Sequence, residues 1–369
     1  MLSVLLNEPY FSGSHAYWAK NIHQYSSHKI TLATLPGRNW KWRMKGSALE
    51  LSRMFADISP EPSVILCSSM MDVALYRSLI NRPDIPVAYY MHENQLCYPS
   101  SPDDPRRKED FHYGFLNFTS CLASDLVLFN SEYHRREFLD ALSNLLHRLP
   151  DYSDPTHWTK LIYDKSEIVY VGIDVNRIKP KAIDLAKSSP RPTLLWNHRW
   201  ESDKRPDLFE TLVLDLYREG HDFNLILLGK NGNRAQIKED IVKKLSSKII
   251  FSGYAQDYEH YCSLLAVADI MPVTSEQDYY GISVIEAILC NCHPIMPKGR
   301  VYSEFFPPKD LPRLFYSDYQ ELLGKTREAI SSCITGTEAL KAHLTAHDVL
   351  TSTFELDSHL KKLSSHSLD

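Results

Sequence analysis

The chain has 369 residues, 43% hydrophobic and 24% charged, a composition typical of a globular protein with more than one hydrophobic core. Its net charge of −5 excludes a general attraction to nucleic acid, so an RNA or DNA partner would need a local basic patch. No apolar run approaches the ~20 residues of a membrane-spanning helix, and the start, MLSVLLNEPY, lacks the basic region of a signal peptide.

Short, nearly continuous hydrophobic runs alternate with helical segments along the whole chain. Runs of this kind predict parallel strands that are covered by helices on both faces. Six lie in the first half, at residues 3–8, 29–35, 63–69, 87–93, 126–131 and 167–173. Six more lie at residues 193–198, 224–230, 248–254, 269–275, 292–297 and 313–317. The pattern predicts an α/β protein made of two doubly wound, Rossmann-like domains.

The alternation of strands and helices pauses at residues 176–192, NRIKPKAIDLAKSSPRP, which are polar and contain three prolines. We place the linker there. The expected domains are residues 1–178 and 190–315, followed by C-terminal helices at 316–369 that pack back toward the first domain. Because such domains bind ligands at the carboxyl ends of their strands, we expect them to face each other across a cleft.

Two polar segments follow strands in the first half. Gly13-Ser14-His15 follows the first strand, where glycine allows close backbone approach and Ser14 can donate a hydrogen bond. A plain turn with a serine helix cap is the alternative. The segment HENQ follows the fourth strand, which places His92 at the ligand-binding edge of the predicted sheet. These polar residues form either a solvated turn or a functional site.

Residues 38–45, RNWKWRMK, combine four cations with two tryptophans. Cations interleaved with aromatic side chains suit single-stranded loops of RNA. The alternative is a solvated loop with both tryptophans tucked into the core, which we favour for the tryptophans but not for the cations. Residues 99–110 form an expected mobile loop, and three more cations at 106–108 would add to the basic patch. The candidate RNA-binding residues are Arg38, Trp40, Lys41, Trp42 and Arg43.

A pair of cations marks the start of the second half. In NHRWESDKRP, residues 197–206, Arg199 and Lys204 lie between a strand and a helix, with Pro206 suited to the first helical turn. Two cations beside the free N–H groups of a helix start suit a phosphate group. The alternative, that both are surface cations in contact with water only, is equally compatible with the sequence. The segment lacks the glycine-rich run of a P-loop, which disfavours a nucleoside triphosphate.

Two carboxylates flank a glycine in SEQDYYGISVIEAILCNCHPI, residues 275–295. Gly281 lies at the expected helix start, where backbone N–H groups would be exposed to an anion. Asp278 precedes the helix and Glu286 lies inside its apolar stretch. A buried carboxylate needs a partner, which a pair of ligand hydroxyls, an arginine or the backbone can supply.

The cysteines favour a reducing compartment. There are seven, an odd number without framework spacing, and we expect a cytoplasmic protein. Cys290 and Cys292 follow an apolar helix, and a second ligand pair for zinc is missing from the sequence. Buried free thiols are therefore the better interpretation of this pair.

The order of these motifs resembles the retaining glycosyltransferases of the GT-B fold, family 4 type. In that family an arginine and a lysine bind the diphosphate of a nucleotide sugar, and a carboxylate-x7-Glu motif follows. Its first carboxylate holds sugar hydroxyls and its second holds the ribose. The resemblance assigns the donor site to Arg199, Lys204, Asp278, Gly281, Ile282 and Glu286. Aspartate stands here where glutamate is usual, and Glu276, a rival carboxylate, does not match the spacing.

Further blocks narrow the resemblance to the tRNA-queuosine mannosyltransferases. The blocks are EPYFSGSH, PGRNWKWRMKGSAL, HENQLCYP, FHYGFLNFTSCLASDLVLFNS and NHRWESDK, spread over both halves. The family implies transfer of mannose from GDP-mannose to the cyclopentenediol of queuosine in the anticodon loop of tRNA-Asp. It also implies that Gly13 and Ser14 face the donor phosphate and that His92 lies beside the transferred sugar. Glu93 and Asn94 would orient the acceptor diol or the loop.

We predict a mechanism that needs no metal ion or other cofactor. Arg199, Lys204 and helix N-termini would supply the positive charge that a cation gives in other transferases. One alternative is a transferase that uses another sugar nucleotide or a lipid or glycan acceptor. The other is a nucleotide-sugar epimerase or binding protein on the same fold. The acidic net charge weighs against a membrane surface.

Overall fold

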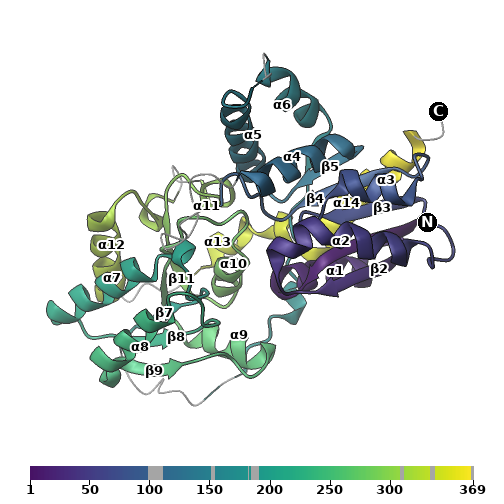
Figure 1. Ribbon diagram of the computed structural model, residues 1–369. Helices are drawn as coiled ribbons and strands as arrows, with labels where there is room; N and C mark the ends of the chain where they lie inside the picture. Colours follow the sequence, from purple (N-terminus) through teal and green to yellow (C-terminus); the bar gives the residue numbers. More distant parts are fainter. Residues whose placement is uncertain are drawn as a thin grey trace. The chain divides into compact units, whose positions relative to one another are not determined.

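The computed structural model describes residues 1–98, 111–150, 154–181, 183, 191–307, 311–332 and 337–366. The expected mobile loop at 99–110 therefore lies outside the described residues, as does most of 182–190 in the predicted linker. The chain forms two compact units (Figure 1). Unit 1 contains Met1–Tyr98, Arg106–Gly172 and Ala346–Asp369, and unit 2 contains Pro99–Pro105 and Ile173–Thr345.

Unit 1 is built on a parallel sheet in which every predicted strand of the first half is present. The strands are β1 (Ser3–Phe11), β2 (Lys29–Pro36), β3 (Val64–Ser68), β4 (Val87–Met91), β5 (Leu126–Phe129) and β6 (Ser166–Ile168). They lie in the order β2-β1-β3-β4-β5-β6. All residues of β3 and β4 are buried, as expected for central strands with helices on both faces.

The helices of unit 1 include one from the far end of the chain. They are α1 (Gly13–Tyr25), α2 (Trp40–Phe55), α3 (Val73–Ile80), α4 (His112–Ala123), α5 (Glu132–Leu146), α6 (Pro155–Asp164) and α14 (Val349–His366). Helix α1 packs with α14, α2 with α3, and α3 with α4 (Figure 1). Asp357 of α14 accepts hydrogen bonds from the Ser26 hydroxyl and from the Ser27 N–H and hydroxyl. These bonds tie α14 to the end of α1.

Unit 2 repeats the arrangement with the six strands predicted in the second half. They are β7 (Thr193–Trp196), β8 (Asn224–Leu227), β9 (Ile249–Ser252), β10 (Ile270–Pro272), β11 (His293–Pro297) and β12 (Phe315–Tyr316). Their order is β12-β11-β10-β7-β8-β9, and all recorded pairings are parallel. The order reverses direction at β7 and β10, which is where a doubly wound sheet binds ligands.

Seven α-helices are described in unit 2, together with short 3₁₀ helices. The α-helices are α7 (Pro206–Arg218), α8 (Ala235–Lys244), α9 (Tyr258–Val267), α10 (Ile282–Leu289), α11 (Tyr302–Phe305), α12 (Tyr319–Ser332) and α13 (Glu338–Ala342). The 3₁₀ helices are η1 (Val175–Arg177), η2 (Ser202–Lys204), η3 (Ser246–Lys248), η4 (Pro312–Leu314) and η5 (Thr345–His347), the last reaching into unit 1. Pro206 occupies the first turn of α7, as predicted.

Two local predictions can be judged from the fold. The segment at 38–45 is not a loop, because α2 begins at Trp40. Trp42 is 60% exposed, so the prediction that it is tucked into the core is wrong. The reason is helical spacing: the inward positions of α2 are taken by Met44, Ala48 and Leu51. Trp40 is half-buried.

Cys290 and Cys292 are buried free thiols, in agreement with the structural interpretation of that pair. Among the helices in the described ranges, none is long and apolar enough to cross a membrane.

Candidate active site

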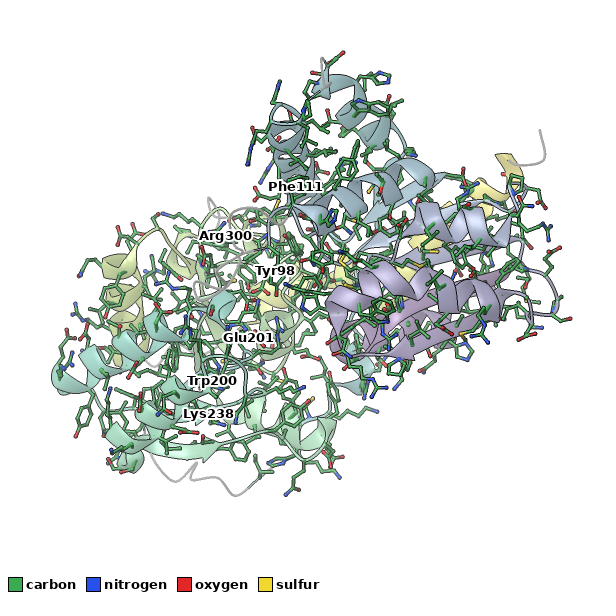
Figure 2. The ribbon with its side chains drawn as sticks, viewed as in Figure 1. Tyr98, Phe111, Trp200, Glu201, Lys238 and Arg300 are labelled. Carbon is green, nitrogen blue, oxygen red and sulfur yellow. The ribbon has the colours of Figure 1, made fainter. Side chains whose placement is uncertain are left out.

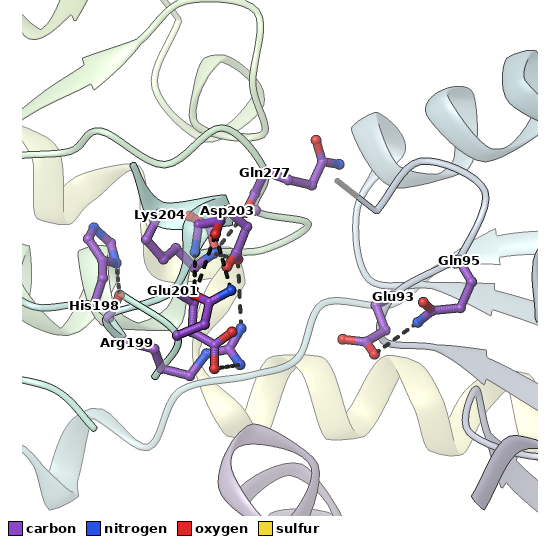
Figure 3. A network of polar contacts seen from close by, with 12 residues as sticks. Glu93, Gln95, His198, Arg199, Glu201, Asp203, Lys204 and Gln277 are labelled. Atoms are coloured by element: carbon purple, nitrogen blue, oxygen red, sulfur yellow. Dashed lines mark hydrogen bonds and ion pairs between the residues drawn. The ribbon is translucent and has the colours of Figure 1, made fainter. Parts of the chain in front are cut away.

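The centre of the candidate site in unit 2 is the buried side chain of Lys204. Its Nζ donates to the carbonyl oxygen of Gln277 and to Oδ1 of Asp278, both at 2.8 Å. Oδ2 of Asp203 lies 3.1 Å away on another side (Figure 3). The three hydrogens of the ammonium group therefore have three acceptors within the chain, and a phosphate must replace one of them.

Backbone bonds place Lys204 against the loop that carries Asp278. The Thr274 hydroxyl donates to the carbonyl of Lys204 at 2.8 Å. The N–H of Glu276 donates to the carbonyl of Asp203, also at 2.8 Å. The loop after β10 is thus fastened to η2 after β7, which brings the two motifs together. The side chain of Glu276, the rival carboxylate, is exposed.

Asp278 is held from both sides. Oδ1 accepts from Lys204, and Oδ2 accepts from the Tyr302 hydroxyl at 2.5 Å. Burial alone would raise the pKa of Asp278, but the charge of Lys204 and these hydrogen bonds lower it to about 2. Asp278 is therefore a carboxylate at neutral pH, with oxygen lone pairs left to accept further hydroxyl groups.

Gly281 begins α10 with a left-handed backbone, φ 81°. A Cβ added at this position would lie 2.7 Å from Cε1 of Tyr302, so a larger residue would push away the tyrosine that donates to Asp278. The first turn of α10 starts at Ile282 and contains no acidic residue, and the cap supplies no side-chain acceptor. Its N–H groups suit an anion beside Asp278.

The buried carboxylate of Glu286 accepts hydrogen bonds from two tyrosines. The hydroxyl of Tyr258 donates to Oε1 at 2.8 Å, and the hydroxyl of Tyr261 donates to Oε2 at 2.9 Å. Burial raises the pKa of Glu286 and these two bonds oppose the rise. Each oxygen keeps a lone pair, so a vicinal diol such as that of a ribose could bind in addition. Both tyrosines come from α9.

Arg199 differs from Lys204 in its exposure. Its side chain is 51% exposed, and its nitrogens lie 3.9 Å from Glu201 Oε1 and 3.7 Å from Asp203 Oδ2 (Figure 3). These contacts are too long for strong hydrogen bonds. Asp203 is buried between the two cations and orients both. The arrangement gives one fixed cation and one accessible guanidinium for a diphosphate.

His198 is a further polar group at this edge of unit 2 that the sequence did not indicate. Its ring is buried, and Nδ1 lies 3.4 Å from the Ser283 hydroxyl near the start of α10. Burial lowers the pKa of His198 to about 4, so the imidazole is neutral at physiological pH. Within the described chain, its Nε2 is buried without a hydrogen-bond partner.

Unit 1 holds a second buried cluster, formed by Glu8 of β1, His15 of α1 and His92 after β4. Nδ1 of His15 lies 3.2 Å from each carboxylate oxygen of Glu8, and the N–H of Tyr10 donates to Oε1 at 2.8 Å. Burial lowers the pKa of His15, but the Glu8 carboxylate outweighs it and the net shift is upward. His15 and Glu8 therefore form a buried ion pair when the imidazole is protonated.

His92 lies at the strand end where the sequence placed it. Its ring packs against His15, Trp18 and Tyr90, with ring centroids 4.2, 4.5 and 4.7 Å away. Burial lowers the pKa of His92 well below its ordinary value, and the charge of His15 lowers it further. Its Nε2 is 3.8 Å from Oε2 of Glu8 and has no hydrogen-bond partner among the described residues. The ring is thus held neutral and fixed in position.

The same three residues could hold a metal ion. One ligand atom each from Glu8, His15 and His92 lies within 4.8 Å of the others. Two imidazoles and a carboxylate suit zinc or another transition metal. A metal would have to take the Glu8 oxygens and His15 nitrogen from their ion pair, and it would release the His15 proton.

The other residues of the HENQ segment have two different roles: Asn94 fixes the loop, and Glu93 is partly exposed to solvent. Asn94 is buried, and its Oδ1 accepts from the N–H groups of Leu96 and Cys97 at 3.1 and 3.0 Å. This geometry is an Asx turn that fixes the loop. Glu93 is half-buried and accepts a bond from the Gln95 amide at 3.3 Å (Figure 3).

The loop after β1 lies against the loop after β2. Helix α1 begins at Gly13, which has a left-handed φ of 54° and open space where a Cβ would be. The cap residue is Ser12, and Ser14 lies exposed within the first turn. A Cβ on Gly37 would come 2.1 Å from Cβ of Ser12, so glycine is required for this approach. It brings Arg38 and the start of α2 beside the predicted phosphate loop.

Several of these site residues could not be identified from the sequence alone. The partners of Asp278 and Glu286 are tyrosines, and the chain has 21 of them. Only the spacing of three between two tyrosines of α9 hints that they share a helix face. Glu8 and His15 do stand inside the EPYFSGSH block, but their contact needs the turn into α1. The unassigned members are Glu8, His15, His198, Tyr258, Tyr261 and Tyr302.

Comparisons with known proteins find matches over both halves of the chain. Residues 3–173 match the family described as tRNA-queuosine alpha-mannosyltransferase N-terminal, and residues 179–329 match glycosyl transferases group 1. A Drosophila melanogaster protein named tRNA-queuosine alpha-mannosyltransferase is 32% identical over 323 residues. The match covers 84% of this chain and 82% of that protein.

Solved structures of low identity share the fold. Sucrose-phosphate synthase from Thermosynechococcus elongatus superposes with a TM-score of 0.73 at 12% identity, over 99% of this chain and 100% of that chain. Anabaena HepE in complex with UDP-glucose gives 0.69 at 15% identity, over 98% and 100%. With the two parallel six-stranded sheets, they confirm the predicted GT-B fold class.

Proposed function

Because the chain belongs to the tRNA-queuosine alpha-mannosyltransferase family and is a GT-B glycosyltransferase, we propose that it transfers mannose from GDP-mannose to queuosine in tRNA. The acceptor is the cyclopentenediol of queuosine in the anticodon loop of tRNA-Asp, and the anomeric configuration is retained. The observation that carries the donor assignment is the buried contact of Lys204 with Asp278. It joins a cation for the diphosphate to a carboxylate for the sugar hydroxyls.

The diphosphate binds to positive charge from three sources. Arg199 reaches it from the surface, and the N–H groups at the start of α10, near Ile282, point at it from the helix end. Lys204 exchanges its contact with Asp203, the longest of its three, for a phosphate oxygen. Charge that develops on the leaving diphosphate is stabilised by groups already in position.

The two carboxylates of unit 2 bind the two sugars of the donor. Asp278 accepts hydrogen bonds from hydroxyls of the mannose while Lys204 and Tyr302 hold it in place. Glu286 accepts from the ribose diol with the lone pairs that Tyr258 and Tyr261 leave open. Gly281 lets the chain turn between them without a side chain in the way.

Membership of the family also implies roles for residues of unit 1. Gly13 and Ser14 present a backbone turn and a hydroxyl to the donor phosphate. His92 contacts the hydroxymethyl end of the mannose as a neutral ring, which its low pKa ensures. Glu93 orients the acceptor diol, and Asn94 shapes the loop that carries it.

The transfer step balances without a cofactor. The acceptor oxygen forms a bond to the anomeric carbon on the face from which the diphosphate departs, as the bond from that carbon to the phosphate oxygen breaks. The proton of the acceptor hydroxyl passes to the leaving phosphate oxygen. Positive charge from Arg199 and Lys204 takes the place that a metal ion has in other transferases.

A mass measurement tests the reaction. The protein is incubated with GDP-mannose and tRNA that contains queuosine, and the RNA is digested to nucleosides. A hexose added to queuosine is the expected product. Conversion of the free donor to another sugar nucleotide without a shift in queuosine would establish an epimerase. Transfer only to a lipid or glycan would establish the other alternative, and UDP-sugars serve as competing donors.

A substitution tests the phosphate assignment. Arg199→Ala is expected to abolish turnover and to leave the fold intact, since the side chain is 51% exposed. Circular dichroism checks the fold, and Arg218→Ala, an exposed arginine of α7, is the matched control. Transfer at a rate near that of the wild type would exclude Arg199 from the donor site.

A further inference from the structure

The start of α2 gathers exposed cations that have no carboxylate partners among the described residues. Arg38, Lys41 and Lys45 are exposed, and Arg43 is half-buried with its Nε donating to the carbonyl of Pro36. Within the described ranges, no carboxylate lies within 4.0 Å of any of these four cations. Arg53, at the other end of the same helix, does pair with a glutamate. The unpaired charge is therefore local to the first turns of α2.

The helix itself adds to this positive charge. The first turn of α2 contains Lys41 and Arg43 but no acidic residue, and Asn39 at the cap makes no side-chain hydrogen bond to it. The N-terminal end of a helix carries partial positive charge, which repels cations and attracts anions. The arrangement is unfavourable in isolation and becomes favourable when phosphate groups bind beside it. In a chain with a net charge of −5, it is a distinct basic surface.

Aromatic rings lie among these cations. The rings of Trp40 and Tyr113, from α2 and α4, have centroids 5.2 Å apart. Nζ of Lys41 lies 5.6 Å from the Trp40 ring and 5.9 Å from the Tyr113 ring, and Nζ of Lys45 lies 5.2 Å from the Tyr113 ring. Phe111, labelled in Figure 2, precedes α4 and is 46% exposed.

Trp42 is an exposed flat surface held against its own helix. Its side chain is 60% exposed although tryptophan normally buries most of its area. A Cβ added to Gly46 would lie 2.6 Å from two atoms of the indole six-membered ring, so the ring lies close over that glycine. Contact with Gly46 restrains the ring in one position and leaves much of it open. Such a ring can stack on an unpaired base at a low cost in entropy.

We propose that this surface, formed by Arg38, Trp40, Lys41, Trp42, Lys45 and Tyr113, binds the single-stranded loop of the acceptor RNA. Trp42 stacks on an unpaired base, and the three exposed cations contact the phosphates on either side. This assignment rests on the proposed function and names the place where its acceptor binds. The surface follows β2 and abuts the loop of Gly13 through Gly37, so the RNA lies beside the expected donor phosphate loop.

The chemistry favours RNA over a membrane or a protein. A membrane-binding face needs a broad apolar area of several aliphatic side chains, whereas here single aromatic rings alternate with cations. The cations have no carboxylates among their described neighbours to satisfy them. Alternating rings and unpaired cations are the pattern by which proteins hold single-stranded RNA.

The cation contacts are tested by salt-dependent binding. Fluorescence anisotropy measures the affinity of the full chain for a labelled anticodon stem-loop RNA over a range of salt concentrations. Lys45→Gln is expected to weaken binding and to reduce the slope of log affinity against log salt by about one. Arg53→Gln, at the other end of α2, is the matched control and leaves both quantities unchanged. Equal effects of the two substitutions would overturn the assignment.

The stacking contact is tested by substitution of the ring. Trp42→Ala is expected to weaken RNA binding roughly 5- to 150-fold, whereas Trp42→Phe retains most of the affinity. Phe354→Ala removes an aromatic residue of similar exposure from α14 and is the control. In turnover, Trp42→Ala raises the KM for RNA and leaves the KM for the sugar nucleotide unchanged. Wild-type affinity in Trp42→Ala would overturn the proposal.

The outcomes separate this inference from the proposed function. If the wild type transfers mannose to queuosine and the variants bind RNA normally, the RNA does not bind at this surface, but the proposed reaction is supported. If the wild type neither binds nor modifies the RNA, the proposed acceptor is wrong. A surface that binds anionic vesicles more tightly than the RNA would assign it to a membrane instead.

Discussion

Each unit holds a buried carboxylate against a cation, but the two cations differ in kind. In unit 2, Asp278 accepts a hydrogen bond from Lys204. In unit 1, Glu8 faces His15, whose charge depends on pH. The first pair lowers the pKa of its acid to about 2, far from neutrality. The second pair instead raises the pKa of its base, because the Glu8 carboxylate favours the protonated imidazole of His15.

The two units therefore use two kinds of buried ion pair, one with a lysine and one with a histidine. In the lysine pair the carboxylate of Asp278 stays ionised near neutrality, because its pKa is about 2. A histidine pair loses its charge as pH rises, and its stabilising effect goes with it. The Asp278 pair should therefore be insensitive to pH near neutrality, whereas the His15 pair should lose its stabilising effect as the pH rises through the folded pKa of His15.

Removal of Lys204 should have the largest effect on stability. Lys204→Ala leaves Asp203 and Asp278 buried without their shared cation, and we expect a loss of ~3–5 kcal/mol in the free energy of unfolding. Urea unfolding followed by far-ultraviolet circular dichroism measures it. The double variant Lys204→Met, Asp278→Asn should recover part of the loss because it removes both charges. A loss below about 1 kcal/mol would contradict the view that Lys204 anchors the site.

The corresponding change in unit 1 should be smaller. Glu8→Gln keeps the shape of the side chain but removes the charge that faces His15, so we expect a loss of ~1.5–3 kcal/mol near pH 6. The same urea experiment measures it. Glu50→Gln, which breaks an exposed pair with Arg53, is the control and should cost under ~1 kcal/mol. A loss no larger than that of the control would mean that the buried pair is not formed.

The pH dependence of stability should separate the two pairs. Since the folded pKa of His15 lies above the unfolded value of 6.5, the pair contributes fully below pH 6.5. Its contribution is lost as the pH rises through the folded pKa. The difference in unfolding free energy between wild type and Glu8→Gln should therefore shrink above pH 6.5. The difference in unfolding free energy between wild type and Asp278→Asn should stay constant over the same pH range. If it shrinks as well, the two ion pairs do not differ in their pH dependence.

Removal of metal ions should have the smallest effect. The proposed reaction uses Arg199 and Lys204, so EDTA should change the rate of transfer less than about twofold. Stoichiometric zinc in the purified protein, lost in Glu8→Gln, would show that the cluster in unit 1 binds metal. A strict dependence of turnover on Mg²⁺ would contradict the proposed mechanism.

The fold could be predicted because its strands are buried on both faces. Such strands appear in sequence as continuous apolar runs, and all twelve predicted runs overlap observed strands. The predictions extended too far at some carboxyl ends; the run at 87–93 includes His92 and Glu93, although β4 stops at Met91. The chain leaves the sheet there: the N–H of His92 donates to the Ser69 hydroxyl, and the Gln95 amide donates to Glu93 within the same segment.

Only those residues of the candidate site that belong to a sequence motif could be predicted. Arg199, Lys204, Asp278 and Glu286 stand at fixed spacings, but the groups that hold them come from elsewhere in unit 2. Tyr302 donates to Asp278 across 24 positions of sequence, and no local pattern reveals that contact. The start of α2 was mistaken for a loop because it lacks an effective cap and carries cations where a helix favours acids.

The membership of α14 in unit 1 has a consequence for biosynthesis. Unit 1 is assembled from Met1–Tyr98, Arg106–Gly172 and Ala346–Asp369, with unit 2 encoded between them. A ribosome makes about 5–20 residues each second, so the first sheet waits for many seconds before the helix that covers it is made. During translation, the surface of α1 that receives α14 is exposed, and chaperones have time to bind it. Nascent-chain proteolysis should show unit 2 becoming protected before unit 1.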